Sequence, residues 1–217
     1  MENSEILLNK ALEALKSVDI PADYWAVGGG TVLKTIYNHR NSKDIDIFIR
    51  DAQFLSSLSP NLNDVTIEAL DYNEMANFIS LTYPEGKVDF IVAGQVTSFS
   101  PTQRDFYGHK IMVEDPVEIV CKKIFYRGSE ALPRDIFDLA IVFNSDRQKD
   151  LIKATLSIEK KFNEFATTFK KLSMKPKYSD RYTEMLRDEG FKIKGKEYQI
   201  CDSFISQVKK QLQQFKR

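Results

Sequence analysis

The sequence has few of the residues that build covalent or metal-linked frameworks. Its 217 residues include two cysteines, Cys121 and Cys201, and two histidines, His39 and His109. Two cysteines do not make the disulfide framework of a small secreted domain, and neither histidine has a second Cys or His at the spacing of a zinc site. We therefore expect an ordinary hydrophobic core without structural zinc. We interpret His39 as a surface residue, and the alternative is a loop residue that reaches a phosphate.

Long apolar segments are also missing. No run approaches the roughly 20 apolar residues that cross a bilayer. The N-terminal residues Met-Glu-Asn-Ser-Glu lack the basic start and apolar stretch of a secretory signal. These two absences predict a cytoplasmic protein with no membrane partner.

Net charge is zero, but the charges are unevenly placed. Residues 1–150 carry a net charge of −8 and residues 151–217 carry +8. A basic final third suits a nucleic-acid partner, whereas the alternative is that its lysines solvate the outer face of a helical bundle. Hydrophobic content of 42% and charged content of 29% are those of a globular chain of one large or two small domains.

Residues 25–50 carry the strongest local pattern. They predict a strand, a glycine turn, a helix, a short basic loop and a second strand with Asp44 and Asp46. Because strand side chains alternate, the two carboxylates point to one face and the neighbouring isoleucines to the other. Adjacent carboxylates repel each other, so the pair favours a divalent cation such as Mg²⁺ between them.

The glycines belong to the same unit. Gly28, Gly29 and Gly30 end an apolar segment, and residues 31–37 follow with helical spacing. Glycine allows a sharp turn and close approach of a phosphate to backbone N–H groups, and the start of a helix favours an anion. Thr31 is placed to cap the helix or to contact a nucleotide.

These motifs resemble a known signature. Residues 29–31 are Gly-Gly-Thr, thirteen residues separate Gly30 from Asp44, and residues 40–46 read Arg-x-Ser-x-Asp-x-Asp. The pattern resembles the DNA polymerase β-like nucleotidyltransferase superfamily, and most closely its abortive-infection toxin branch, AbiEii/AbiGii-like, with the related mycobacterial toxins. The resemblance implies an α+β fold, in which a mixed central sheet flanked by helices precedes a C-terminal helical bundle.

A second stretch resembles the same family. Residues 117–123 lie within a predicted helix and read Val-Glu-Ile-Val-Cys-Lys-Lys, and residues 134–139 read Arg-Asp-x-x-Asp-Leu. Lys123 fits the family lysine best, with Lys122 second, and Asp138 fits the second family aspartate. The charged side chains between residues 134 and 138 could instead form an interhelical salt-bridge network, which is the alternative to a role in the site. We expect a nucleotidyltransferase core over residues 1–114 and a mainly helical domain over residues 115–217.

The other elements follow from periodicity. We expect helices at residues 4–17, 51–58, 115–127, 132–143, 182–187 and 198–215, and one or two helices at residues 147–172. We expect strands at residues 64–70, 77–83 and 87–92, and a strand or hairpin arm at residues 105–113. Phe162, Phe165 and Phe169 have helical spacing and are assigned to the core. Lys192, Lys194 and Lys196 form the most basic segment, which is predicted to aid RNA binding.

Asp89 interrupts the apolar strand at residues 87–92 and matches the position of the superfamily's third carboxylate, whose role is to activate the acceptor hydroxyl. A solvent-facing aspartate is the alternative. The resemblance thus implies three groups of site residues. Asp44, Asp46 and Asp89 would bind Mg²⁺ or Mn²⁺; Gly29, Gly30, Thr31, Ser42 and Lys123 would bind the nucleotide; and Arg40, Arg134, Asp135 and Asp138 would have supporting roles.

The predicted reaction moves a nucleoside monophosphate from an NTP to an acceptor. By resemblance, the acceptor is RNA, plausibly a tRNA 3′ end, and the protein is the toxin of a toxin–antitoxin system with a cognate antitoxin. Two alternatives stay open. One is a nucleotidyltransferase for a protein or an aminoglycoside-type small molecule, and the other is a degenerate binding or antitoxin module.

Overall fold

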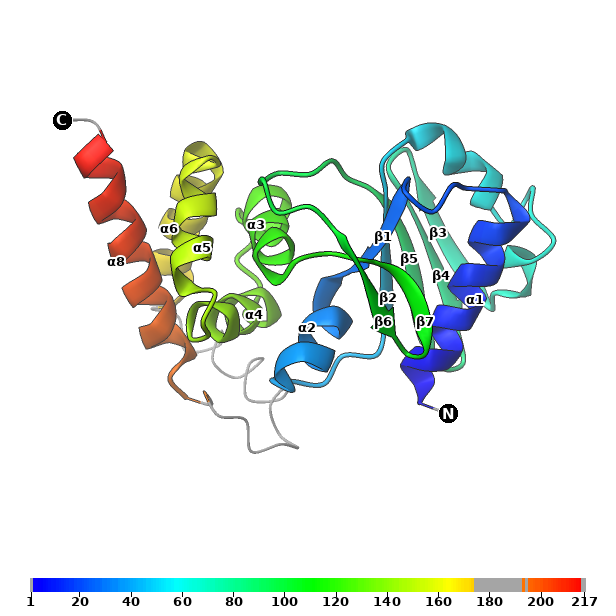
Figure 1. Ribbon diagram of the computed structural model, residues 1–217, viewed down its shortest axis with the longest axis horizontal. Helices are drawn as coiled ribbons and strands as arrows, with labels where there is room; N and C mark the ends of the chain where they lie inside the picture. The colour runs from blue at the N-terminus through cyan, green and yellow to red at the C-terminus, as the bar shows by residue number, and fades with distance from the viewer. Residues whose placement is uncertain (1, 174–192, 194, 216–217) are drawn as a thin grey trace. The chain divides into compact units, whose positions relative to one another are not determined.

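The computed structural model describes residues 2–173, 193 and 195–215. The strands and two α-helices lie before residue 115, and α-helices make up the described elements that follow (Figure 1). The strands are β1 (Trp25–Gly28), β2 (Ile45–Ile49), β3 (Asp71–Met75), β4 (Phe78–Tyr83), β5 (Gly86–Val92), β6 (Thr102–Phe106) and β7 (His109–Val113). The α-helices are α1 (Asn3–Ser17), α2 (Gly29–Tyr37), α3 (Pro116–Arg127), α4 (Pro133–Phe143), α5 (Gln148–Leu156), α6 (Glu159–Ser173) and α8 (Glu197–Phe215).

The chain forms two compact units. The first contains residues 1–35, 42–94 and 101–115, and the second contains residues 36–41, 95–100 and 116–217. Two short pieces of the N-terminal half therefore belong to the helical second unit. Each unit is described by itself below.

The first unit is built on one mixed sheet with the strand order β3-β4-β5-β2-β1-β7-β6. β2 runs parallel to β5 and antiparallel to β1, while β1 runs parallel to β7. Helix α1 packs on β2 and β5, and its apolar face is buried as its periodicity predicts. The mixed sheet with helices confirms the predicted fold class.

The second unit is a bundle in which α3, α4, α5, α6 and α8 pack on one another. Aromatic rings fill its centre: Phe204 of α8 lies 5.4 Å from Phe143 and 5.9 Å from Phe162, measured between ring centroids. Phe162, Phe165 and Phe169 are all buried, which confirms their assignment to the core. Within the described residues, no helix is both long and apolar enough to cross a membrane.

Three expected elements differ. Residues 105–113, expected as one strand or hairpin arm, contain the end of β6, a turn at Tyr107 and Gly108, and β7. Residues 64–70 do not form the predicted strand but contain a 3₁₀ turn, η3 (Thr66–Glu68). The reason is the Asn63 side chain, whose Oδ1 accepts hydrogen bonds from the N–H groups of Val65 and Thr66 and so turns the backbone. The strand that follows this turn is β3. Its five residues are all exposed, so the sequence shows no alternation of apolar and polar residues that would predict a strand.

The short helix expected at residues 51–58 is also a pair of 3₁₀ turns, η1 (Ala52–Phe54) and η2 (Ser56–Leu58). The helix expected at residues 182–187 and most of the basic segment, with Lys192 and Lys194, lie outside the described residues.

Candidate active site

The glycine turn joins a buried strand to a short helix, as predicted. All four residues of β1 are buried, and α2 begins directly at Gly29. Gly29 has a φ of +73°, a conformation that residues with a Cβ rarely adopt. A Cβ at Gly29 would also collide with the Asp46 carboxylate. The turn therefore needs glycine for two reasons, which are its backbone conformation and the lack of space beside the Asp46 carboxylate.

Asp46 and Asp89 are neighbours across two parallel strands. They occupy the same register of β2 and β5, so their side chains leave the sheet on the same face, about 4.8 Å apart in strand spacing. The residues before and after them in the strands point to the other face and are fully buried. The Ser80 hydroxyl of β4 donates to Asp89 Oδ1 at 2.5 Å.

Asp44 lies one residue before β2 rather than in it. Its Oδ1 accepts the Lys87 N–H at 3.0 Å, and its backbone carbonyl accepts the Thr31 hydroxyl at 2.6 Å. Thr31 Oγ1 also hydrogen-bonds Ser42 Oγ at 3.0 Å. Thr31 is fully buried inside the first turn of α2, so it fixes the segment from Ser42 to Asp44 and is not the helix cap.

The donor set fits a hard divalent cation. Two carboxylates on adjacent strands, with a third two residues upstream, are the oxygen ligands that Mg²⁺ prefers. In the part of the chain that the structure describes, however, no three His, Cys, Asp or Glu side chains converge as a ready ligand group. The structure thus brings Asp46 and Asp89 together, while the Asp44 carboxylate binds the backbone of residue 87. The metal assignment of all three stays a prediction.

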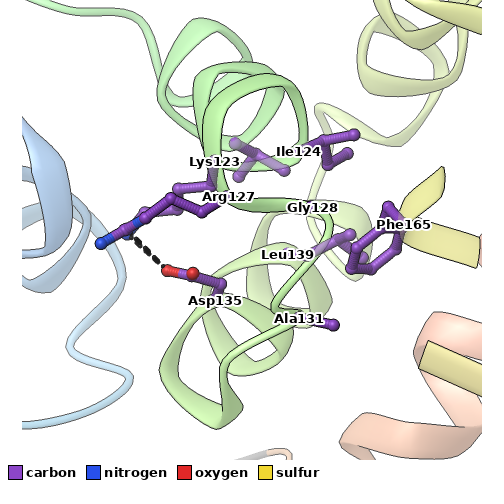
Figure 2. Close-up of a pocket in the computed structure, with 9 residues that line it drawn as sticks. Lys123, Ile124, Arg127, Gly128, Ala131, Asp135, Leu139 and Phe165 are labelled. Atoms are coloured by element: carbon purple, nitrogen blue, oxygen red, sulfur yellow. Dashed lines mark hydrogen bonds and ion pairs between the residues drawn. The ribbon is translucent and has the colours of Figure 1, made fainter. Parts of the chain in front are cut away.

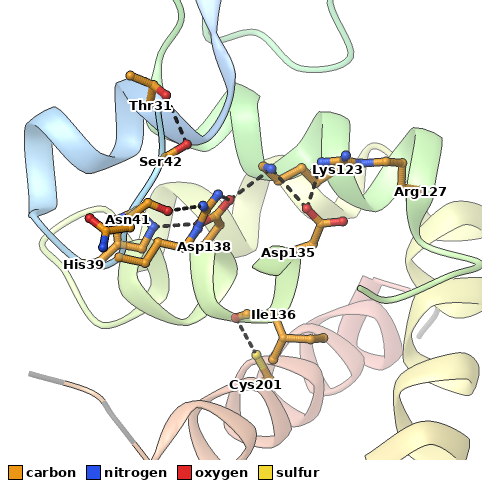
Figure 3. A network of polar contacts seen from close by, with 11 residues as sticks. Thr31, His39, Asn41, Ser42, Lys123, Arg127, Asp135, Ile136, Asp138 and Cys201 are labelled. Atoms are coloured by element: carbon orange, nitrogen blue, oxygen red, sulfur yellow. Dashed lines mark hydrogen bonds and ion pairs between the residues drawn. The ribbon is translucent and has the colours of Figure 1, made fainter. Parts of the chain in front are cut away.

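A second charged cluster lies in the helical unit (Figure 3). Asp138 of α4 is fully buried and accepts Arg40 Nε at 2.6 Å and Arg40 Nη2 at 2.9 Å. His39 Nε2 lies 2.6 Å from the same carboxylate, and Lys123 Nζ lies 3.0 Å from it. Burial alone would raise the pKa of Asp138. The charges of Arg40 and Lys123 and the hydrogen bonds from Arg40 and His39 instead hold that pKa well below its usual value.

Lys123 is held from two sides. Its ammonium lies 3.0 Å from Asp135 Oδ1 as well as 3.0 Å from Asp138, and its side chain is only 9% exposed. Arg127 Nη2 shares Asp135 Oδ1 at 2.8 Å. A small cavity beside these residues has apolar walls opposite the charged groups (Figure 2), and its volume of about 10 Å³ holds no more than one water molecule. This cavity is therefore too small for a nucleotide.

Sequence reasoning placed some of these side chains and missed others. His39 was interpreted as a surface residue, and this was wrong: it is 2% exposed and stacks on the Phe137 ring. No local signal marks it, because its partner Asp138 is 99 residues away. Ser80 and Arg127 were also missed. Arg134, which was expected to support the site, is exposed at the start of α4 and takes no part in the described network.

Comparison with known proteins agrees with the architecture. The model of the nucleotidyl transferase AbiEii toxin family, type IV toxin–antitoxin system, matches residues 10–196. No curated protein matches the chain significantly.

Several solved structures are similar. A protein from H. pylori assigned as a nucleotidyltransferase shares 12% identity, with 98% of this chain and 96% of that chain covered and a TM-score of 0.50. The toxin MenT4 from Mycobacterium tuberculosis H37Rv shares 14% identity with a TM-score of 0.45, and the match covers 76% of this chain but only 63% of MenT4. The antibiotic-resistance factor ANT(2″)-Ia shares 14% identity over 84% of this chain and 95% of that chain, with a TM-score of 0.47. At these identities the structural likeness concerns the fold alone.

Proposed function

The chain belongs to the AbiEii family of nucleotidyltransferase toxins. We propose that it transfers a nucleoside monophosphate from an NTP to an RNA acceptor such as a tRNA 3′ end, with Mg²⁺ or Mn²⁺. The observation that carries the proposal is the pairing of Asp46 with Asp89, next to the glycine turn that begins α2. These parts supply the two things that nucleotidyl transfer needs, which are carboxylate oxygens for a cation and N–H groups for a phosphate.

The substrate triphosphate would bind at the start of α2. The N–H groups of Gly29 and Gly30 have no partner within the helix at its first turn, so they can donate to phosphate oxygens. Asp44, Asp46 and Asp89 would hold the divalent cation, which supplies charge neutralisation at the phosphates when bound. Ser42 is tied to Thr31 and to the backbone before β2, so it would orient this segment and contact the phosphates.

Asp89 would act on the acceptor. The Ser80 hydroxyl fixes one of its oxygens, and the carboxylate takes the proton of the acceptor hydroxyl as that oxygen attacks the α-phosphorus. A bond forms between the acceptor oxygen and the α-phosphorus, and the bond from that phosphorus to the bridging oxygen of the β-phosphate breaks. Pyrophosphate leaves with that bridging oxygen. Positioning and charge stabilisation supply most of the rate in such a reaction.

The role of Lys123 toward the triphosphate is also part of the proposal. Its ammonium is shared between Asp135 and Asp138, so binding a phosphate would require it to exchange a carboxylate for a phosphate oxygen. Arg40 and Asp138 would then act as positioning residues, because they fix the segment that leads into Ser42 and Asp44.

The partners of the reaction are inferred from family and charge. The family description places its members in type IV toxin–antitoxin systems, which supports an antitoxin partner. The net charge of +8 over residues 151–217 supports a polyanionic acceptor such as RNA. A cytoplasmic location agrees with both.

A transfer assay tests the proposal. The protein would be incubated with each α-labelled NTP and total cellular RNA, with Mg²⁺ or with EDTA, beside the Asp46→Asn variant. We expect label on tRNA-sized RNA that disappears with EDTA and in the variant. Label on protein or on a small molecule instead would retain nucleotidyl transfer and refute the RNA acceptor. An absence of both labelling and Mg²⁺–nucleotide binding would support the degenerate binding module.

A further inference from the structure

One stretch of the first unit lacks positive charge altogether. Between Arg50 and Lys87 there is no lysine or arginine, although an even distribution of the 31 basic residues would place about five there. The same stretch carries six acidic residues: Asp51, Asp64, Glu68, Asp71, Glu74 and Glu85. Its surface is therefore strongly acidic in a chain whose net charge is zero.

The same stretch concentrates exposed apolar side chains. Nine large apolar residues are exposed in the described part of the chain, and five of them lie within residues 62–75. They are Leu62, Ile67, Leu70, Tyr72 and Met75. Leu62 and Leu70 are each more than 70% exposed, which costs hydrophobic free energy unless something covers them.

Three of these side chains, Leu70, Tyr72 and Met75, lie in or directly beside an open sheet edge. β3 is the last strand of the sheet and pairs only with β4 among the described strands (Figure 1). Natural edge strands are usually protected by lysine, proline or a bulge, and Asp71–Met75 has no lysine or proline and pairs with β4 in unbroken register. Asn61 Nδ2 donates to the Tyr72 hydroxyl and Ser59 Oγ donates to Glu74, so the strand is already held in an extended, ordered form.

We propose that the outer edge of β3 is a docking site for an extended, basic segment of a partner protein, which adds to the sheet as an eighth strand. Its backbone would pair with residues 71–75. Side chains alternate along the strand, so Asp71 and Met75 lie on one face, and Glu74 lies on the other with the adjoining Leu70. On each face a lysine or arginine of the segment would lie beside the carboxylate, and an apolar side chain would cover Met75 or Leu70. The charge selects this occupant: an acidic surface repels RNA. A second copy of β3 is a poor occupant as well. If two β3 strands paired antiparallel, their four carboxylates, two of Asp71 and two of Glu74, would lie close together and repel one another. This inference is independent of the proposed catalytic function.

The test uses two synthetic peptides and the full-length protein. One peptide repeats Lys-Lys-Val-Val, which places both lysine and valine on each face of a strand, and the other repeats Glu-Glu-Val-Val. We expect the lysine peptide to bind at least about tenfold more tightly, with an affinity that falls as salt is added. Hydrogen exchange should slow at those amides of residues 71–75 that point away from β4 when the lysine peptide is bound, because strand addition protects outward-pointing N–H groups.

A pair of variants locates the binding. Leu70→Lys with Met75→Lys places positive charge at the edge and should weaken the lysine peptide about tenfold or more. Ile36→Lys with Phe215→Lys makes the same change at two other exposed apolar positions and should leave binding unchanged. Circular dichroism confirms that both variants fold.

Three results would overturn the proposal. The first is equal binding of the two peptides, and the second is binding that survives the Leu70→Lys, Met75→Lys change. The third is a dimer in solution that this change dissociates, which would assign the edge to a second copy of the chain.

Discussion

Asp46 and Asp89, 43 positions apart in the sequence, face each other at the same register of two parallel strands, and the Ser80 hydroxyl holds one oxygen of the second carboxylate. Gly29 lies directly against the Asp46 carboxylate, so any larger residue at this position would overlap Asp46. The candidate site is thus fixed by backbone pairing rather than by long, flexible side chains.

Replacing Asp46 by asparagine should abolish most activity without unfolding the protein. The amide is nearly the same size but carries no charge for a cation, so we expect a loss of about 100- to 1,000-fold in kcat. Labelled nucleotide transfer measures the loss. Asp23→Asn is the matched control, because Asp23 is exposed and lies outside the site. Equal activity of the two variants would remove Asp46 from the mechanism.

Alanine at Gly29 should be more damaging than alanine at another glycine with the same backbone. Gly29 and Gly108 have φ values of +73° and +79°, but a Cβ at Gly108 meets no atom within 4 Å. Gly108→Ala should cost about 1–2 kcal/mol of stability from the left-handed conformation alone. Gly29→Ala adds overpacking against Asp46, worth a further 1–3 kcal/mol or so. Urea unfolding of both variants gives the difference, and equal costs would contradict the close contact.

Arg40→Ala should destabilise the protein strongly. It would leave the buried Asp138 carboxylate without its bidentate partner, and breaking such a pair costs about 3–5 kcal/mol. The control is Lys161→Ala, which breaks a Lys161–Glu164 pair whose side chains are both 40% exposed and should cost at most about 1 kcal/mol. Urea unfolding measures both variants. Similar losses in the two would show that the Arg40–Asp138 pair does not stabilise the helical unit.

The stabilising effect of Asp138 should depend on pH in a defined direction. Its pKa in the folded protein lies well below the ordinary value of 3.8, so its contribution is complete above about pH 4 and is lost as pH falls through the folded pKa. Asp138→Asn should therefore destabilise the protein most at neutral pH. The difference in unfolding free energy between the variant and the unmodified protein should become smaller in acid. Unfolding free energies measured from neutral pH downward test this. A difference in unfolding free energy that grows toward low pH would contradict the ion-pair assignment.

The order of helices and strands could largely be predicted because the signals are local. Gly28 to Gly30 ends one element and begins another, Pro116 starts α3, and alternation marks β2 and β5. β3 could not be predicted, since all its residues are exposed and alternation then carries no information. The turn at Asn63 depends on one side-chain amide that outcompetes strand pairing.

Within the candidate site, the sequence predicted residue types better than partners. The spacing of Asp44 and Asp46 indicated a shared face, but the register that sets Asp89 beside Asp46 is a tertiary feature. Lys123 was expected to face a nucleotide, whereas the structure surrounds it with Asp135 and Asp138. A salt-bridge network was the stated alternative for this region, and spacing on a helix cannot decide between the two.

The assignment of residues 36–41 and 95–100 to the helical unit restricts how the protein can be divided and made. A fragment starting at Pro116 would lose Arg40 and His39 from Asp138, and would also lose the N–H groups of Val96 and Thr97 that bind the Glu118 carboxylate. During synthesis, both short pieces leave the ribosome well before α3 and α4 exist to receive them. The helical half is therefore not a contiguous module, because the partners of two of its buried carboxylates, Asp138 and Glu118, come from earlier in the chain.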